Sequence, residues 1–147
     1  MTIPEIFEKE GEDAFRDVES QVLDQVHAYV RCVVSTGGGA VCRSANWSKL
    51  HTGIVVWLDV DTEVIMKRIE GTDRPLLQTE NPLETLNKIF KDRKSRYEQA
   101  DVHVKVTPDM NEHDVVSAVI KKVHEFIDNN PPARQTAEAK AQAEGID

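Results

Sequence analysis

Apolar positions along this chain follow two periods, one typical of strands and one typical of helices. Three short β-branched runs predict buried strands at 31–36 (RCVVST), 54–59 (IVVWLD) and 102–106 (VHVKV). Apolar residues three or four positions apart predict helices at 3–10, 12–29, 43–50, 61–70, 82–100 and 111–130. Strands that alternate with helices predict an α/β fold of three layers, in which a parallel sheet is flanked by helices.

Two segments have no apolar period. Residues 72–81 contain Arg74-Pro75 and are expected to form a loop. Residues 131–147 begin with two prolines and continue mainly with Ala, Glu, Gln and Lys, which predicts a disordered C-terminal tail. We therefore expect one domain over residues 1–130.

Charge and composition exclude several classes of partner. The chain has 18 Lys and Arg against 26 Asp and Glu, a formal net charge of −8, which disfavours a nucleic-acid surface. No apolar stretch approaches the roughly 20 residues that span a bilayer, so no membrane partner is expected. Acidic side chains among the first ten residues are untypical of a signal or transit peptide. Cys32 and Cys42 have no metal-ligand spacing, and a thiol in the strand at 31–36 is expected to be buried.

Three glycines directly follow the first predicted strand. Gly37, Gly38 and Gly39 would let a ligand approach the backbone and would leave amide N–H groups free at the carboxyl end of that strand. The same residues would equally suit a tight strand-to-helix turn with no ligand. No Gly-Lys-Ser/Thr follows the glycines, so the turn is not an ATP phosphate-binding loop.

Three arginines, Arg16, Arg93 and Arg74, are candidates for binding an anionic ligand. Arg16 and Glu19 are three residues apart on one predicted helix, which fits either an anion-binding arginine held by Glu19 or a solvated surface ion pair. Arg93 continues the apolar stripe of its helix, so its guanidinium needs either an internal carboxylate or a bound anionic ligand. Arg74 is either solvated or, if its loop closes as a lid, directed at phosphates.

Taken in order, five stretches of the sequence resemble shikimate kinases. They are IPEIFEKEGEDAFRDVES, STGGGAVCRSANW, VVWLDV, DRPLL and the segment from Arg93 to Tyr97 before ADVHV, and the similarity covers about residues 3–106. The residues around Asn46-Trp47 and the VVWLDV run are most similar to plant, algal or cyanobacterial members. The resemblance implies a nucleoside monophosphate kinase-like P-loop fold. It also implies transfer of the γ-phosphoryl group of ATP, with Mg²⁺, to the 3-hydroxyl of shikimate in aromatic amino-acid (chorismate) biosynthesis.

The resemblance further implies roles for individual residues. The shikimate-binding set would be Arg16, Glu19, Gly37, Gly38, Gly39 and Arg93, in which the two arginines meet the carboxylate and Glu19 orients Arg16. Arg74 would come from a lid over about 71–82 and act in catalysis by neutralising ATP phosphates. Arg68 would be a second ATP-binding arginine, and residues 107–111 would lie at the adenine.

One large departure from the family pattern limits this expectation. The 147 residues contain no Gly-x-x-Gly-x-Gly-Lys-Ser/Thr loop and no strand ending in Asp-x-Asp, so the first two strands and the main ATP and Mg²⁺ residues are missing from them. We therefore expect residues 1–130 to form an incomplete shikimate kinase-like domain that is inactive alone.

Two alternatives remain open at this point. One is a non-catalytic shikimate kinase-like protein with a binding or regulatory role, and the other is a relative with a different, nucleoside-type acceptor. In the family, the strand of the phosphate-binding loop lies between the strands expected here at 31–36 and 54–59. Three outcomes stay open where that strand is missing: these two strands pair directly, another protein or a second copy donates a strand, or the chain is poorly folded alone. The expected compartment is the plastid stroma in a eukaryote and the cytoplasm otherwise.

Overall fold

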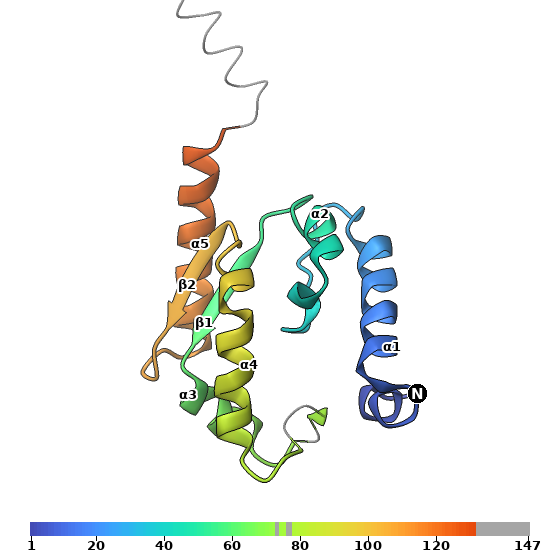
Figure 1. The fold of residues 1–147 in the computed structure, drawn as a ribbon. Coiled ribbons are helices and arrows are strands. Elements are labelled where there is room, and N and C mark those ends of the chain that lie inside the picture. Colours follow the sequence, from blue (N-terminus) through green and yellow to red (C-terminus); the bar gives the residue numbers. More distant parts are fainter. Residues whose placement is uncertain (73, 76–77, 132–147) are drawn as a thin grey trace, which may run out of the picture.

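The structure is a computed structural model, and it describes residues 1–72, 74–75 and 78–131. The first part of the chain forms α1 (Ile3–Val26), the 3₁₀ turns η1 (Ala40–Cys42) and η2 (Ser44–Asn46), and α2 (Trp47–Leu50). The second part forms β1 (Val56–Val60), α3 (Thr62–Ile69), α4 (Pro82–Tyr97), β2 (Val102–Val106) and α5 (Glu112–Asn129) (Figure 1). The predicted tail lies, from residue 132 on, outside the described residues.

Local sequence signals explain where the long helices begin and bend. Thr2 caps α1 in a capping box with Glu5, and Asn111 caps α5 in the same way with Asp114. Gly11 interrupts α1 with a φ of 86°, a left-handed conformation that glycine adopts without a steric penalty. The helices predicted at 3–10 and 12–29 are therefore present as the two helical stretches of α1, which meet at the kink at Gly11, and the second ends at Val26.

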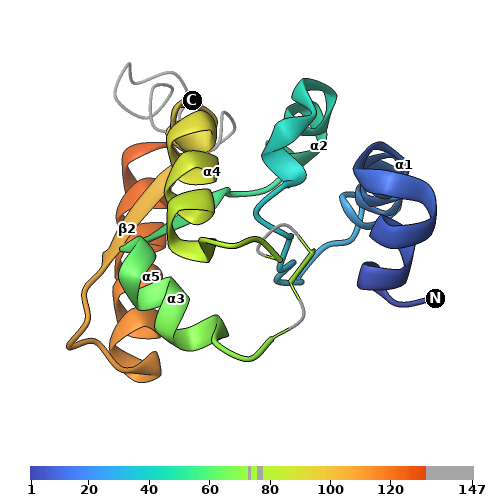
Figure 2. The ribbon, with the colours of Figure 1, turned by 60° about the horizontal axis from the view of Figure 1, so that its bottom comes forward.

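The sheet consists of two parallel strands, β1 and β2, with Val56 opposite Val102 and Val60 opposite Val106. The three valines of β2 at 102, 104 and 106 are buried and pack against the apolar face of α5. On the other face, Trp57 of β1 stacks on Tyr97 of α4, so the sheet lies between α5 and α4 (Figure 2). The parallel α/β arrangement in three layers is confirmed.

The strand predicted at 31–36 is wrong. Residues 32–37 belong to neither a helix nor a strand, and no backbone hydrogen bond joins this segment to 54–59 within the described part of the chain. Val33 is 98% exposed, and Cys32, expected to be buried, is exposed as well. β-Branched side chains favour a strand conformation, but a strand also needs a neighbouring strand whose backbone satisfies its N–H and C=O groups.

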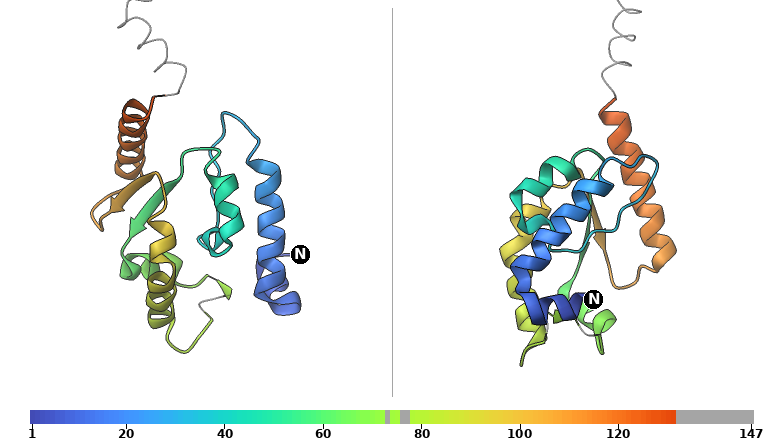
Figure 3. Two further views of the ribbon diagram at one scale, coloured as in Figure 1. Left: turned by 45° about the horizontal axis from the view of Figure 1, so that its top comes forward. Right: turned by 90° about the vertical axis from the view of Figure 1, so that its right-hand side faces the viewer.

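The first part of the chain forms a group of its own beside the sheet. Ion pairs fasten α1 to the segment after the glycines, with Arg43 contacting Asp17 at 2.9 Å and Lys49 contacting Asp24 at 2.5 Å. Figures 1 and 3 show α1 and α2 side by side, on the side of the molecule away from α5. Helix α4 contacts η1 and so joins this group to the sheet.

No helix in the described ranges is both long and apolar enough to cross a membrane. The helices predicted at 61–70, 82–100 and 111–130 are present as α3, α4 and α5, each a few residues shorter than expected. The helix predicted at 43–50 is divided into η2 and α2.

Candidate functional site

A buried arginine is the centre of the site. Arg16 is only 5% exposed, and its Nη1 donates to Oε2 of Glu19 at 2.8 Å. Its Nη2 and Nε both donate to Oε1 of Glu12, at 3.1 and 3.3 Å. Burial of the guanidinium disfavours the charged form, but the hydrogen bond to Glu19 and the charge of Glu19, followed by the hydrogen bond to Glu12, outweigh it and raise the pKa of Arg16. The solvated surface pair is therefore the wrong interpretation of Arg16 and Glu19.

The glycine turn packs directly on this charged cluster. A Cβ atom at Gly39 would lie 2.2 Å from the Cζ and Nη1 atoms of Arg16, closer than real contacts allow. A Cβ atom at Gly37 would lie 3.1 Å from Oε1 of Glu19. A larger residue at Gly39 would therefore force the guanidinium of Arg16 or the turn to shift.

Helix α4 contributes the opposite side of the turn. The phenol of Tyr97 donates a hydrogen bond of 2.8 Å to the carbonyl oxygen of Gly38. Arg93 lies four residues before Tyr97 and therefore on the same face of α4. Among the described residues, no carboxylate forms an ion pair with Arg93, which is half-buried. The internal partner considered for Arg93 is thus not found in this part of the chain.

Two amide groups of the turn are available to an acceptor. The turn is closed by hydrogen bonds from the N–H of Ala40 to the oxygen of Gly37, 3.1 Å, and from the N–H of Cys42 to the oxygen of Gly39, 2.9 Å. Within the described residues, the N–H groups of Gly38 and Gly39 donate to no protein atom. An oxygen-bearing ligand could accept from them beside Arg16.

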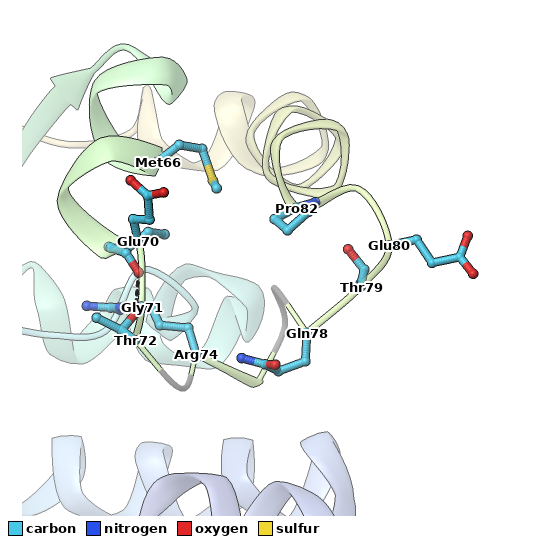
Figure 4. A pocket seen from close by; sticks show the side chains of 10 residues that line it. Met66, Glu70, Gly71, Thr72, Arg74, Gln78, Thr79, Glu80 and Pro82 are labelled. Atoms are coloured by element: carbon cyan, nitrogen blue, oxygen red, sulfur yellow. Dashed lines mark hydrogen bonds between the residues drawn. The ribbon is translucent and has the colours of Figure 1, made fainter.

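The predicted lid arginines lie at a different place. Arg74 is exposed and lines an open hollow of about 920 Å³ between the end of α3 and the start of α4, together with Met66, Glu70, Gln78 and Pro82 (Figure 4). Gly71, which begins this loop, has a φ of 78°. Arg68 is exposed on α3 and does not line the hollow. Asp73, Leu76 and Leu77 of the DRPLL stretch lie outside the described residues.

Three contributors to the site were not predicted. Glu12 could have been found from its spacing of four residues to Arg16. Tyr97 was named only as the end of the segment from Arg93 that resembles shikimate kinases, and its contact could not be predicted because its partner Gly38 is 59 residues away in the chain. Asn46 is buried and donates from Nδ2 to the oxygen of Ala40 at 2.9 Å, a contact that no sequence spacing reveals.

The family model described as shikimate kinase matches residues 1–124 of this chain. The chain belongs to the shikimate kinase family. This family membership confirms the resemblance drawn from the five sequence stretches. The matched range includes both the glycine turn and the segment from Arg93 to Tyr97.

Individual sequences and solved structures that are similar to this chain agree with this membership. The shikimate kinase of Synechococcus elongatus is 41% identical over 92% of this chain and 74% of its own length. That of Nostoc punctiforme is 41% identical over 83% of this chain and 68% of its own. Among solved structures, shikimate kinase from Acinetobacter baumannii in complex with shikimate has a TM-score of 0.77 at 34% identity, covering 88% of this chain and 72% of that one. The enzyme from Aquifex aeolicus has a TM-score of 0.68 at 31% identity, covering 84% and 73%.

These likenesses also support the fold class. The structural neighbours are shikimate kinases, so the arrangement around β1 and β2 is that of the nucleoside monophosphate kinase-like P-loop fold. Shikimate kinases in general use ATP and Mg²⁺. In the described ranges, no group of three or more His, Cys, Asp or Glu side chains could hold a metal ion.

Proposed function

We propose that this chain supplies the shikimate-binding part of a shikimate kinase, an enzyme that phosphorylates the 3-hydroxyl of shikimate with ATP. The observation that carries the proposal is the buried Arg16, held by Glu12 and Glu19 against the glycine turn. The relative from Acinetobacter baumannii, solved with shikimate, supports a small carboxylate as the ligand.

The N–H groups of Arg16 that are not bound to Glu12 or Glu19 determine which hydrogen bonds a ligand can accept. A guanidinium has five N–H donors, and three of them are used by Glu12 and Glu19. One N–H on each Nη atom is left, a pair that suits the two oxygens of a carboxylate. Because two carboxylates already surround Arg16, the net attraction for an anion has to come from a second cation, and we assign that role to Arg93. Gly37, Gly38 and Gly39 would supply the backbone surface beside it.

The ATP side of the proposal rests on the lid. Arg74 would close over the hollow between α3 and α4 and neutralise phosphates during transfer, with Arg68 as an accessory cation, and residues 107–111 would meet the adenine. The 147 residues carry no phosphate-binding loop, so we propose that they do not phosphorylate shikimate by themselves. No step is assigned to Mg²⁺, for which the described residues offer no ligand cluster.

The free edge of β1 motivates a proposed partner. In the described part of the chain β1 has one strand neighbour, β2, which leaves its other edge without backbone partners. We propose that this edge pairs with a strand donated by another protein or by a second copy, and that the 147 residues alone are marginally stable. The cytoplasm, or the plastid stroma in a eukaryote, remains the proposed compartment.

Shikimate binding tests the proposal and can be measured without turnover. Isothermal titration of the 147-residue chain should give a saturable affinity, and Arg93→Ala should weaken it about tenfold or more, the value of one charge-assisted contact. Lys91→Ala, which removes an exposed cation of the same helix α4, is the control and should bind as the wild type does. Equal affinity of the wild type and Arg93→Ala would remove Arg93 from the site.

A coupled assay of ADP release distinguishes the catalytic proposal from a purely binding or regulatory role. The chain alone should show no shikimate-dependent turnover. If a polypeptide carrying the phosphate-binding loop restores turnover, the chain is part of an enzyme. If binding is present and no such polypeptide restores turnover, the binding role is favoured. Turnover by the 147 residues at the rate of a complete kinase would contradict the proposed inactivity.

A further inference from the structure

We propose that Tyr97 is a positioning residue that fixes the glycine turn for its ligand. Its hydroxyl holds the carbonyl of Gly38 and thereby directs the N–H of Gly39 away from α4 and toward the side of Arg16. The identity of the ligand as shikimate rests on the proposed function, whereas the effect of Tyr97 on the turn does not.

The geometry of the peptide between Gly38 and Gly39 carries the argument. All peptide bonds described are trans, and in a trans peptide the C=O and the N–H point in opposite directions. Tyr97 binds the C=O of this peptide at 2.8 Å, so the N–H of Gly39 points away from Tyr97. Gly39 itself packs against the guanidinium of Arg16. The hydrogen bond thus selects the peptide orientation in which a donor accompanies the arginine.

Glycines make such a constraint necessary. Three consecutive glycines have the largest choice of backbone conformations, and without a fixed point the peptide at 38–39 could turn its N–H in other directions. The turn's own hydrogen bonds use the carbonyls of Gly37 and Gly39 and leave that of Gly38 to Tyr97.

Tyr97 is itself held by the sheet. Its ring stacks on Trp57 of β1 with centroids 5.9 Å apart, and Trp57 stacks in turn on His103 of β2 at 4.2 Å. Trp57 and His103 are opposite each other in the strand register. The stacked rings therefore fix the position of Tyr97, and with it the glycine turn, relative to the sheet. Arg93 lies on the same face of α4 as Tyr97.

Replacement of the hydroxyl alone separates this role from packing. Tyr97→Phe keeps the ring on Trp57, and water can replace the phenol at Gly38 because Gly38 is exposed. The melting temperature should therefore change little. Shikimate affinity should fall about three- to tenfold, the range expected for one hydrogen bond. Replacement by 4-aminophenylalanine, which retains an N–H donor at the same place, should restore the affinity.

Amide hydrogen exchange of the ligand-free chain gives a second, independent readout. Tyr97→Phe should accelerate exchange at Ala40 and Cys42, whose N–H groups close the turn, while the amides of β2 stay as slow as in the wild type. Wild-type affinity for shikimate in Tyr97→Phe would overturn the positioning role and leave the proposed function intact. Unchanged exchange at both Ala40 and Cys42 would overturn it too. If the wild type does not bind shikimate, the proposed function fails, and faster exchange in Tyr97→Phe would still support the effect of Tyr97 on the turn.

Discussion

The glycine turn and the segment just before it have opposite surroundings. At the turn, a charged residue, Arg16, is 5% exposed and has three of its N–H groups bound to carboxylates. A few residues earlier, Val33 is 98% exposed and Val34 is 47% exposed. The usual places of a charge and of an apolar side chain are thus reversed within one small part of the molecule.

The two regions differ in where the partners of their side chains lie. Arg16 finds both partners within its own helix, at spacings of three and four residues, and the turn packs on it. The valines of 31–36 would need a strand beside them and a helix above them, as Val104 has in β1 and α5. The charged cluster of α1 and the turn can therefore form although, among the described residues, the segment before the turn pairs with no strand.

The largest expected effect compares two valines of similar sequence surroundings. Val104→Ala removes two carbon atoms from a side chain that is 1% exposed, and it should lower the free energy of unfolding by about 2–3 kcal/mol. Val33→Ala should change it by less than about 0.5 kcal/mol. Urea unfolding followed by circular dichroism measures both. Similar losses for the two variants would mean that Val33 is buried in solution, and the contrast between the regions would fail.

The next effect compares the two carboxylates on Arg16. Glu19 is 14% exposed and Glu12 is 45% exposed. Glu19→Ala leaves a buried guanidinium with one partner, and we expect a loss of about 2 kcal/mol. Glu12→Ala should cost about 0.5 kcal/mol or less, because water can take its place. Equal losses in the same unfolding measurement would show that both contacts have the same environment.

Gly39 tests how closely the turn packs on the arginine. Gly39→Ala places a methyl group where the guanidinium now lies, 2.2 Å from Cζ, so Arg16 or the turn has to move. Shikimate affinity should fall about tenfold or more, the loss of one charge-assisted contact. Gly53→Ala is the control, since a Cβ atom there meets nothing within 4 Å. Wild-type affinity in Gly39→Ala would place the ligand elsewhere.

The smallest effect concerns the link between α1 and α2. A hydrogen bond from Lys49, and then its charge, hold the pKa of Asp24 below its ordinary value. Because the folded pKa is the lower one, the stabilisation is present above about pH 4 and is lost as the pH falls through the folded pKa. Lys49→Met should return the pKa of Asp24 toward its ordinary value, as followed by the carboxyl ¹³C shift. An unchanged titration curve would contradict the pair.

Much of the fold and site followed from the sequence. The helix bounds depend on local signals such as the Thr2 and Asn111 caps, and the buried strand at 102–106 depends on an alternating pattern that α5 covers. The prediction of a strand at 31–36 was wrong because a strand needs a neighbouring strand to pair with, and the local sequence pattern does not show whether one is present. The contact between Arg16 and Glu19 was predicted from their spacing, whereas the contact of Tyr97 with Gly38 depends on how α4 is placed against the turn.

The central claim is that the shikimate site is built on α1, the glycine turn and α4, separately from the unpaired segment before it. A titration of the ¹⁵N-labelled chain with shikimate, followed residue by residue by NMR, tests this most directly. The account predicts saturable shifts at Arg16, at the amides of Gly37, Gly38 and Gly39, and along Arg93 to Tyr97. Residues 31–34 and the amides of α5 should stay unchanged. Saturable shifts confined to α5 or to 31–34, or no saturable shifts at all, would contradict it.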